Sequence, residues 1–73
     1  MAWRDVVLSI VQREWKPGQR FTLDDIYRFE HELSKKYPLN RHVRDKIRQQ
    51  LQVLRDEGQL VFEDDHGTYR RTG

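Results

Sequence analysis

Apolar residues near the start of the chain recur at steps of three and four positions. They are Trp3, Val6, Val7, Ile10, Val11 and Trp15. This spacing gathers the apolar side chains on one side of a helix. The Pro17-Gly18 pair that follows is a typical end signal. The pattern predicts a first helix over residues 3–15.

A second periodic segment follows a short extended piece at residues 20–23. Thr22 is a favourable N-cap, and Asp25 three residues later completes an arrangement like a capping box, with Asp in place of Glu or Gln. The apolar positions that follow are Ile26, Phe29, Leu33 and Tyr37, and Pro38 closes the segment. We therefore expect a second helix from about residue 23 to residue 36.

The third periodic segment is the clearest in the chain. Its apolar residues are Val43, Ile47, Leu51 and Leu54, at steps of four, four and three. Asn40 is the expected N-cap, and Gly58 is the expected C-terminal stop. The third helix is therefore predicted between these two residues.

The last segment has the pattern of a β-hairpin. Two short apolar or β-prone runs, residues 60–62 and 68–70, flank the turn Glu63-Asp64-Asp65-His66-Gly67. Leu60 and Phe62 should share one face, because side chains alternate along a strand. The extended piece at Phe21-Thr22 is placed to pair with the hairpin as a third strand.

The order of these elements predicts the fold. Only Tyr37 to Asn40 separate the second and third helices, so these helices form a helix-turn-helix. A helix-turn-helix followed by a hairpin is the winged-helix arrangement. We predict an α+β winged helix, with a three-helix core and a C-terminal β-hairpin wing, as one domain over residues 1–73.

Composition narrows the possible functions. The chain has no cysteine, which excludes a disulfide scaffold and a cysteine-ligated zinc site. Its three histidines are scattered, and no catalytic triad, Walker or GxGxxG pattern is present. No apolar run approaches the roughly 20 residues that span a bilayer, and no signal-peptide pattern opens the chain. We expect a cytoplasmic, monomeric, non-enzymatic protein with no metal, cofactor, membrane or small-molecule substrate.

The positive charge is concentrated in one segment although the net charge is only +2. Residues 35–48 contain six basic residues and one acidic residue, whereas the rest of the chain has an excess of acidic residues. A local basic surface is typical of nucleic-acid binding. A solvated basic helix explains the charge alone equally well.

In a helix-turn-helix, the N-terminal part of the second helix faces base edges in the major groove. Arg suits guanine, Asn and Gln suit adenine, and Asp accepts from an amino group. The candidate base-reading residues are Asn40, Arg41, His42, Arg44, Asp45, Arg48 and Gln49. The candidate phosphate-contacting residues are Lys35, Lys36, Lys46, His66, Arg70 and Arg71. The three acids of the hairpin turn, Glu63, Asp64 and Asp65, would repel phosphate.

Several of these segments together resemble a known family. The strings Phe21–Glu30, Asp45–Asp56 and Gly67–Arg70, with Asn40 and Val43, are similar to the C-terminal winged-helix domain of DpnI-type (Dam-replacing family) methyl-directed restriction endonucleases. The resemblance covers nearly all of residues 20–71. Over residues 1–19 only the helical periodicity supports the assignment.

The resemblance implies a reader of double-stranded DNA that recognises N6-methyladenine in GATC, without the nuclease domain of a restriction–modification enzyme. The methyl group would meet Asn40, Arg41, His42, Val43 or the aliphatic stems of Arg44 and Arg48. Two alternatives remain open. One is a winged-helix DNA binder of the transcription-regulator type, indifferent to methylation, and the other is a module whose basic helix binds an acidic protein.

Overall fold

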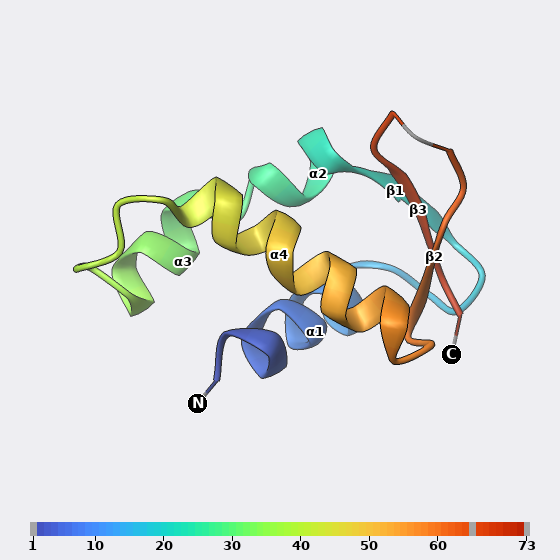
Figure 1. Ribbon diagram of the computed structural model, residues 1–73, viewed down its shortest axis with the longest axis horizontal. Helices are drawn as coiled ribbons and strands as arrows, with labels where there is room; N and C mark the ends of the chain where they lie inside the picture. Colours follow the sequence, from blue (N-terminus) through green and yellow to red (C-terminus); the bar gives the residue numbers. More distant parts are fainter. Residues whose placement is uncertain (1, 65, 73) are drawn as a thin grey trace.

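The computed structural model describes residues 2–64 and 66–72, and its elements follow the predicted order. They are α1 (Trp3–Glu14), β1 (Arg20–Thr22), α2 (Leu23–Tyr27), α3 (Glu30–Lys36), α4 (Val43–Asp56), β2 (Leu60–Phe62) and β3 (Thr68–Arg71). In Figure 1, α4 crosses the middle of the molecule, α1 lies beside it, and the small sheet stands at the C-terminal end of α4. The α+β winged-helix prediction is confirmed.

The first helix packs one apolar side against α4. Its buried residues are Val6, Val7, Ile10 and Val11. The Trp15 side chain, just after the helix, stacks on Phe21 of β1 with ring centroids 4.2 Å apart. The chain therefore passes from α1 to the sheet through a continuous apolar contact.

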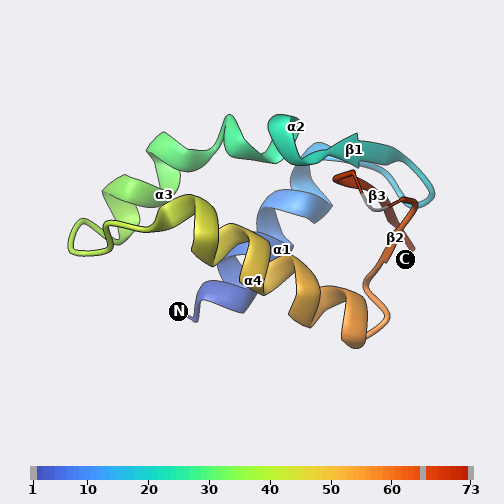
Figure 2. The same ribbon diagram turned by 45° about the horizontal axis from the view of Figure 1, so that its top comes forward.

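The second predicted helix is in fact two helices, so the expectation of one helix over residues 23–36 is wrong at Arg28 and Phe29. The Phe29 amide donates to the Ile26 carbonyl at 3.0 Å and the Arg28 amide to the Asp25 carbonyl at 3.4 Å. These three-residue bonds tighten the turn and separate α2 from α3. Figure 2 shows the two helices following one another above α4.

The start of α2 is formed as the sequence predicts. The Thr22 hydroxyl accepts from the Asp25 amide at 3.1 Å, and the Asp25 carboxylate accepts from the Thr22 amide at 2.9 Å. Both bonds of a capping box are thus present, and they satisfy amides that the helix leaves without partners.

The start of α4 differs from the prediction, because His42 and not Asn40 is its N-cap. The Asn40 side-chain oxygen accepts from the His42 amide at 2.8 Å. This bond closes a local turn two residues before the helix, so the Asn40 side chain is engaged in the turn and not in capping.

The predicted apolar stripe of α4 is confirmed in full. Val43, Ile47, Leu51 and Leu54 are all buried. Gly58 follows the helix with φ +80°, and the Gln59 amide donates to the Leu54 carbonyl at 2.9 Å. A left-handed residue after the last turn is a common helix stop, so this expectation is also confirmed.

The sheet has the strand order β1-β3-β2, with both pairs antiparallel. The predicted third strand is therefore present, and β3 lies in the centre. Phe21 and Phe62 both lie opposite Tyr69, and their ring centroids are 5.4 and 4.8 Å from its ring. Leu60 and Phe62 share the inward face, whereas Val61 is exposed.

One backbone contact ties the hairpin to the start of α2. The Leu23 amide donates to the Gly67 carbonyl at 2.8 Å. Gly67 has φ +89°, and a Cβ atom there would lie 3.2 Å from the Leu23 Cβ atom. Only glycine is free of strain in this position, and the close approach fixes the end of the hairpin beside α2.

We expect Ile47→Ala to cost about 2–5 kcal/mol of unfolding free energy, because it removes a fully buried side chain from the contact between α4 and the other helices. In a domain of this size that is a large part of the total. Urea denaturation would measure it, with Gln49→Ala on the exposed side of the same helix as control. An Ile47→Ala variant as stable as the parent would contradict the assigned core.

Candidate nucleic-acid interface

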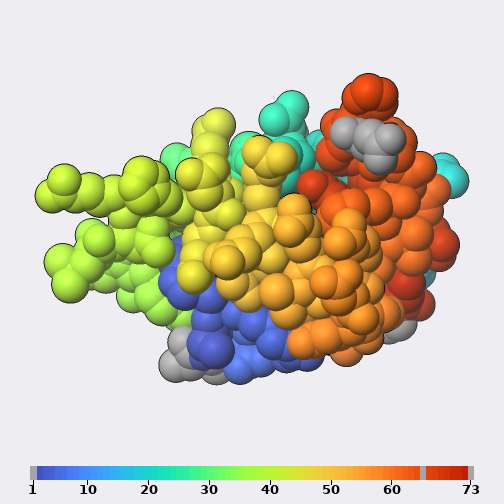
Figure 3. All heavy atoms as spheres, viewed as in Figure 1, coloured from blue at the N-terminus to red at the C-terminus, as the bar shows by residue number. Residues whose placement is uncertain are grey.

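Because its stripe is turned inward, α4 presents a polar face to solvent. The exposed residues of this face are Arg44, Asp45, Arg48, Gln49, Gln52 and Arg55. Figure 3 shows this helix, in yellow and orange, lying open across the front of the molecule. Helical geometry places Arg44, Arg48 and Arg55 in one row on the flank toward α2 and the sheet. Asp45 and Gln49 lie a quarter turn further out.

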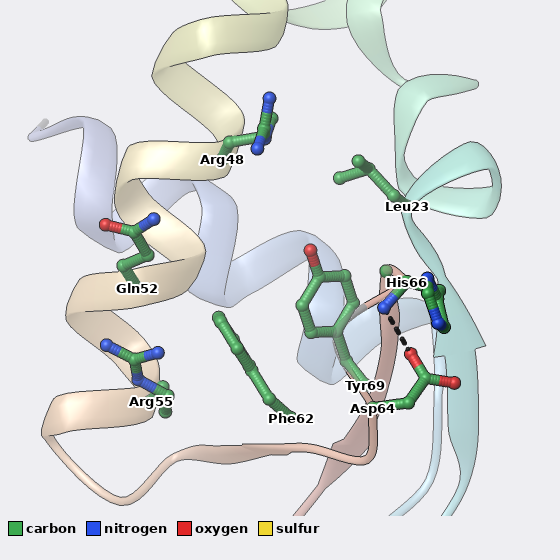
Figure 4. Close-up of a pocket in the computed structure, with 9 residues that line it drawn as sticks. Leu23, Arg48, Gln52, Arg55, Phe62, Asp64, His66 and Tyr69 are labelled. Atoms are coloured by element: carbon green, nitrogen blue, oxygen red, sulfur yellow. Dashed lines mark hydrogen bonds between the residues drawn. The ribbon is translucent and has the colours of Figure 1, made fainter.

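A groove separates this row from the hairpin, which we call the wing (β2, β3 and the residues between them). The groove encloses about 500 Å³. It is lined by Leu23, Arg48, Gln52, Arg55, Phe62, Asp64, His66, Gly67 and Tyr69. Figure 4 shows Arg48, Gln52 and Arg55 along one wall, Leu23 facing them, and the Tyr69 and Phe62 rings between. We refer to it as the wing groove.

The wing groove combines apolar side chains with polar groups, among which Arg55 donates to Asp56 and the Asp64 carboxylate accepts two backbone bonds. Arg48 has no hydrogen bond or ion pair within residues 2–64 and 66–72. The Tyr69 ring is buried, and its hydroxyl oxygen points into the groove (Figure 4). Burial raises the pKa of Tyr69, and the positive charge of Arg48 opposes this only in part. The phenol therefore stays protonated at neutral pH and can donate a hydrogen bond.

Arg44 lies at the N-terminal end of the same row and is held by two other helices. Its Nε atom donates to the Glu30 carboxylate on α3. Its guanidinium carbon lies 4.7 Å from the centre of the Tyr27 ring on α2. The side chain is nevertheless 61% exposed, so it is oriented without being covered.

Three predicted base-reading residues lie in the turn before α4. Asn40 is half-buried and bonded to the His42 amide, as described above. Arg41 and His42 are exposed, and His42 Nδ1 lies 4.0 Å from an Asp45 carboxylate oxygen. These residues are therefore at the end of the α4 face and outside the wing groove.

The predicted phosphate-contacting lysines occupy two places. Lys35 and Lys36 are exposed in the last turn of α3, at the same end of the molecule as the start of α4 (Figure 1). Lys46 is half-buried. It precedes Arg48 by two residues and therefore projects from the opposite side of α4. The structure does not bring these lysines together with the wing groove.

The predicted wing residues point in three directions. His66 is exposed and lines the wing groove. Arg70 lies on the outer face of the sheet and donates to the Glu63 carboxylate at 2.6 Å. Arg71 lies on the inner face and donates to the Trp15 carbonyl at 2.6 Å. Of the acidic turn, Asp65 lies outside the described residues.

Sequence reasoning missed five residues of the wing groove that carry its shape. Gln52 and Arg55 continue the row of Arg48 at helical spacing, so the periodicity of α4 could have identified them. Leu23, Phe62 and Tyr69 come from three other elements. Only the strand order and the contact at Gly67 bring them to α4, so no local signal marks them.

The described part of the chain contains no group of three or more His, Cys, Asp or Glu side chains arranged to hold a metal ion. Nor does any helix there have the length and apolar character needed to cross a membrane. The chemistry available in the wing groove is hydrogen bonding, apolar contact, and charge of both signs, positive from Arg48 and Arg55 and negative from Asp64.

Comparison with known protein families gives a match over nearly the whole chain. The family model described as the Dam-replacing HTH domain matches residues 2–71, nearly the whole chain. The match includes residues 2–19, where the sequence resemblance is weakest. A helix-turn-helix domain of this kind binds DNA.

We expect Arg48→Ala to weaken specific DNA binding by about 1–3 kcal/mol, as the loss of a base contact should. Its melting temperature should barely change, because the side chain is exposed and makes no ion pair in the described structure. Arg13→Ala, which removes the same charge from α1, is the control and should leave specific binding nearly unchanged. A large fall in melting temperature for Arg48→Ala would show that α4 is rotated from the position described.

The wing should loosen in acid through Asp64 and Glu63, because Arg70 also holds the pKa of Glu63 below its ordinary value. Asp64 Oδ1 accepts from the His66 and Thr68 amides at 2.8 and 3.2 Å, and the bond to the His66 amide is the main cause of its lowered pKa. A lowered pKa means that Asp64 stabilises the folded wing above its ordinary pKa of about 3.9 and loses this effect as pH falls through the lowered value.

Hydrogen exchange of the Thr68 amide, measured relative to Ile47, reports this change. Protection at Thr68 should be full near pH 6 and fall below about pH 4. In Asp64→Asn, which keeps an acceptor oxygen but does not titrate, the fall should be smaller, and what remains reports Glu63. Equal pH dependence in the two proteins would contradict a role for Asp64.

Proposed function

The chain belongs to the Dam-replacing HTH domain family, a DNA-binding and non-catalytic domain type, and from this premise we propose that it reads N6-methyladenine in double-stranded GATC. The endonucleases that the sequence resembles use their C-terminal winged helix for this recognition. In the proposed complex α4 enters the major groove, and the wing groove faces the modified bases.

The observation that carries the proposal is the mixed lining of the wing groove. Paired N6-methyladenine donates its one remaining amino hydrogen to thymine and places a methyl group in the major groove beside the N7 acceptor. A reader must therefore offer an apolar surface beside hydrogen-bonding groups. Leu23, Phe62 and Tyr69 supply apolar surface next to Arg48 and Gln52.

The polar side chains of α4 match the rest of the methylated base. A glutamine side-chain amide can donate to adenine N7, which stays free in the major groove when the remaining N6 hydrogen pairs with thymine. Gln49 and Gln52 are both exposed on α4, and Gln52 also lines the wing groove. We assign the adenine contact to one of these two residues and the methyl contact to the apolar part of the wing groove.

One copy of the domain suffices for a fully methylated site. The two adenines of GATC lie on adjacent base pairs and on opposite strands, so their methyl groups are close together in the major groove. A single α4 face with its wing groove can meet both. We therefore propose that the domain binds as a monomer, with one domain per duplex.

Sequence-independent affinity would come from the basic residues around this face. Lys35, Lys36 and Arg41 are exposed at one end of it, and His66 at the other. Arg70 is paired with Glu63, and Arg71 bonds to the end of α1. We therefore assign the main phosphate contacts to the exposed residues Lys35, Lys36, Arg41 and His66.

A domain that binds methylated DNA can direct a nuclease to that DNA when the two are joined in one protein. We propose that the domain directs such an enzyme, in a restriction–modification setting, to methylated DNA. The site of action would be the cytoplasm of a prokaryotic or virus-infected cell, where the DNA is present.

Affinity should rank doubly methylated GATC above hemimethylated GATC, and both above the unmethylated site. A buried methyl group contributes about 0.8 kcal/mol by transfer from water, so two should give a little over tenfold from apolar contact alone. Anisotropy titrations of the three duplexes at physiological salt would measure the ratios. The three salt slopes should agree, because phosphate contacts do not depend on methylation.

Equal affinity for the three duplexes would refute the methyl-reading proposal and leave the winged helix intact. If GATC were still preferred over other sequences, the domain would be a methylation-indifferent DNA binder. Binding that showed no sequence preference and disappeared in salt would favour a non-specific mode. Failure to bind any duplex would favour the protein-interaction alternative.

A further inference from the structure

Arg44 differs from the other arginines of α4 because side chains of two other helices contact it. It lies at the N-terminal end of the exposed polar face of α4. Its Nε atom is bonded to Glu30 on α3, and its guanidinium group lies over the Tyr27 ring on α2. Arg48, one turn further along, has no comparable ion pair in the described structure. The two arginines therefore differ in how far their orientation is fixed before any ligand arrives.

The two contacts leave one edge of the Arg44 guanidinium group available. Within the described residues, the terminal nitrogens Nη1 and Nη2 have no hydrogen-bond partner. Two parallel N–H donors in one plane match the O6 and N7 acceptors of guanine in the major groove. The Tyr27 ring fixes the plane of the group, and Glu30 fixes its rotation.

The position of Glu30 is otherwise difficult to explain at a DNA-binding surface. A carboxylate beside α4 repels phosphates, so it weakens binding to every duplex. An exposed ion pair also adds little to the stability of the fold. Its presence is understandable if it orients Arg44, because an oriented side chain loses less freedom on binding.

We propose that Arg44 reads the guanine of the recognition site and that Glu30 and Tyr27 are positioning residues that make this contact selective. The inference rests on the proposed function only in that α4 enters the major groove. It does not depend on which part of the wing groove meets the methyl group. Glu30 would then set specificity through Arg44, without touching DNA itself.

The test compares GATC duplexes with duplexes in which 7-deazaguanine, which lacks the N7 acceptor, replaces both guanines. For the wild-type domain the substitution should weaken binding about fivefold to tenfold per guanine contacted, since it removes one of two hydrogen bonds. In Arg44→Ala the preference for guanine should fall by this factor, and any preference that remains measures other guanine contacts, such as one from Arg48. Both DNAs are prepared with and without N6-methyl groups.

Two substitutions at Glu30 separate positioning from simple charge. Glu30→Ala removes the acceptor for Arg44, so it should reduce the preference for guanine over 7-deazaguanine nearly to the value measured for Arg44→Ala. Glu30→Gln keeps an acceptor oxygen and should retain most of the preference. Both variants should bind a non-specific duplex more tightly than wild type, because a negative charge is lost. Glu32→Ala, on the same helix but paired with Arg13, is the control and should keep the wild-type preference.

Three outcomes would overturn the inference. The first is a wild-type domain that binds both duplexes equally, and the second is an unchanged preference in Arg44→Ala. The third is an unchanged preference in Glu30→Ala, which would leave Arg44 a reader without positioning by Glu30. If the domain bound methylated and unmethylated GATC equally but still preferred guanine to 7-deazaguanine, only the proposed function would be refuted.

Discussion

Burial of the apolar stripe of α4 is the constraint on which the rest of the structure depends. Val43, Ile47, Leu51 and Leu54 lie against the other helices and the sheet. A helix has one rotation that buries all four, so the same packing determines which side chains face solvent. The core and the recognition surface are therefore two sides of one helix. This explains how so short a chain presents an ordered polar face.

The wing groove depends on a second arrangement, the central position of β3. Because β3 pairs with both β1 and β2, Tyr69 is packed between Phe21 and Phe62 and its hydroxyl is directed toward α4. The bond from Leu23 to Gly67 then holds the wing beside α2. Apolar side chains from α2 and the sheet are thereby brought to a helix whose outer face is otherwise polar. This combination of apolar and polar side chains distinguishes the surface from a helix that presents only basic side chains.

Elements fixed by local patterns could be predicted from the sequence, and features fixed by distant contacts could not. The spacing of the α4 stripe gave that helix and its orientation correctly. Asn40 was assigned wrongly because an asparagine can cap a helix or close a turn, and its neighbours decided in favour of the turn. The break at Phe29 likewise has no sequence signal. At the site, helical spacing is enough to predict that Arg48 and Gln49 are exposed on α4. The position of Tyr69 in the wing groove depends on the strand order, which the sequence does not reveal.

The central claim is that DNA lies against the outer face of α4 and the wing groove, with the methyl group among its apolar side chains. The most direct test is an NMR study of the domain with a GATC duplex carrying ¹³C-labelled N6-methyl groups. The account predicts contacts from the methyl protons to Leu23, Phe62 or Tyr69, with the largest amide shifts in α4 and the wing. Contacts to α1, or shifts centred on Trp3, would contradict it.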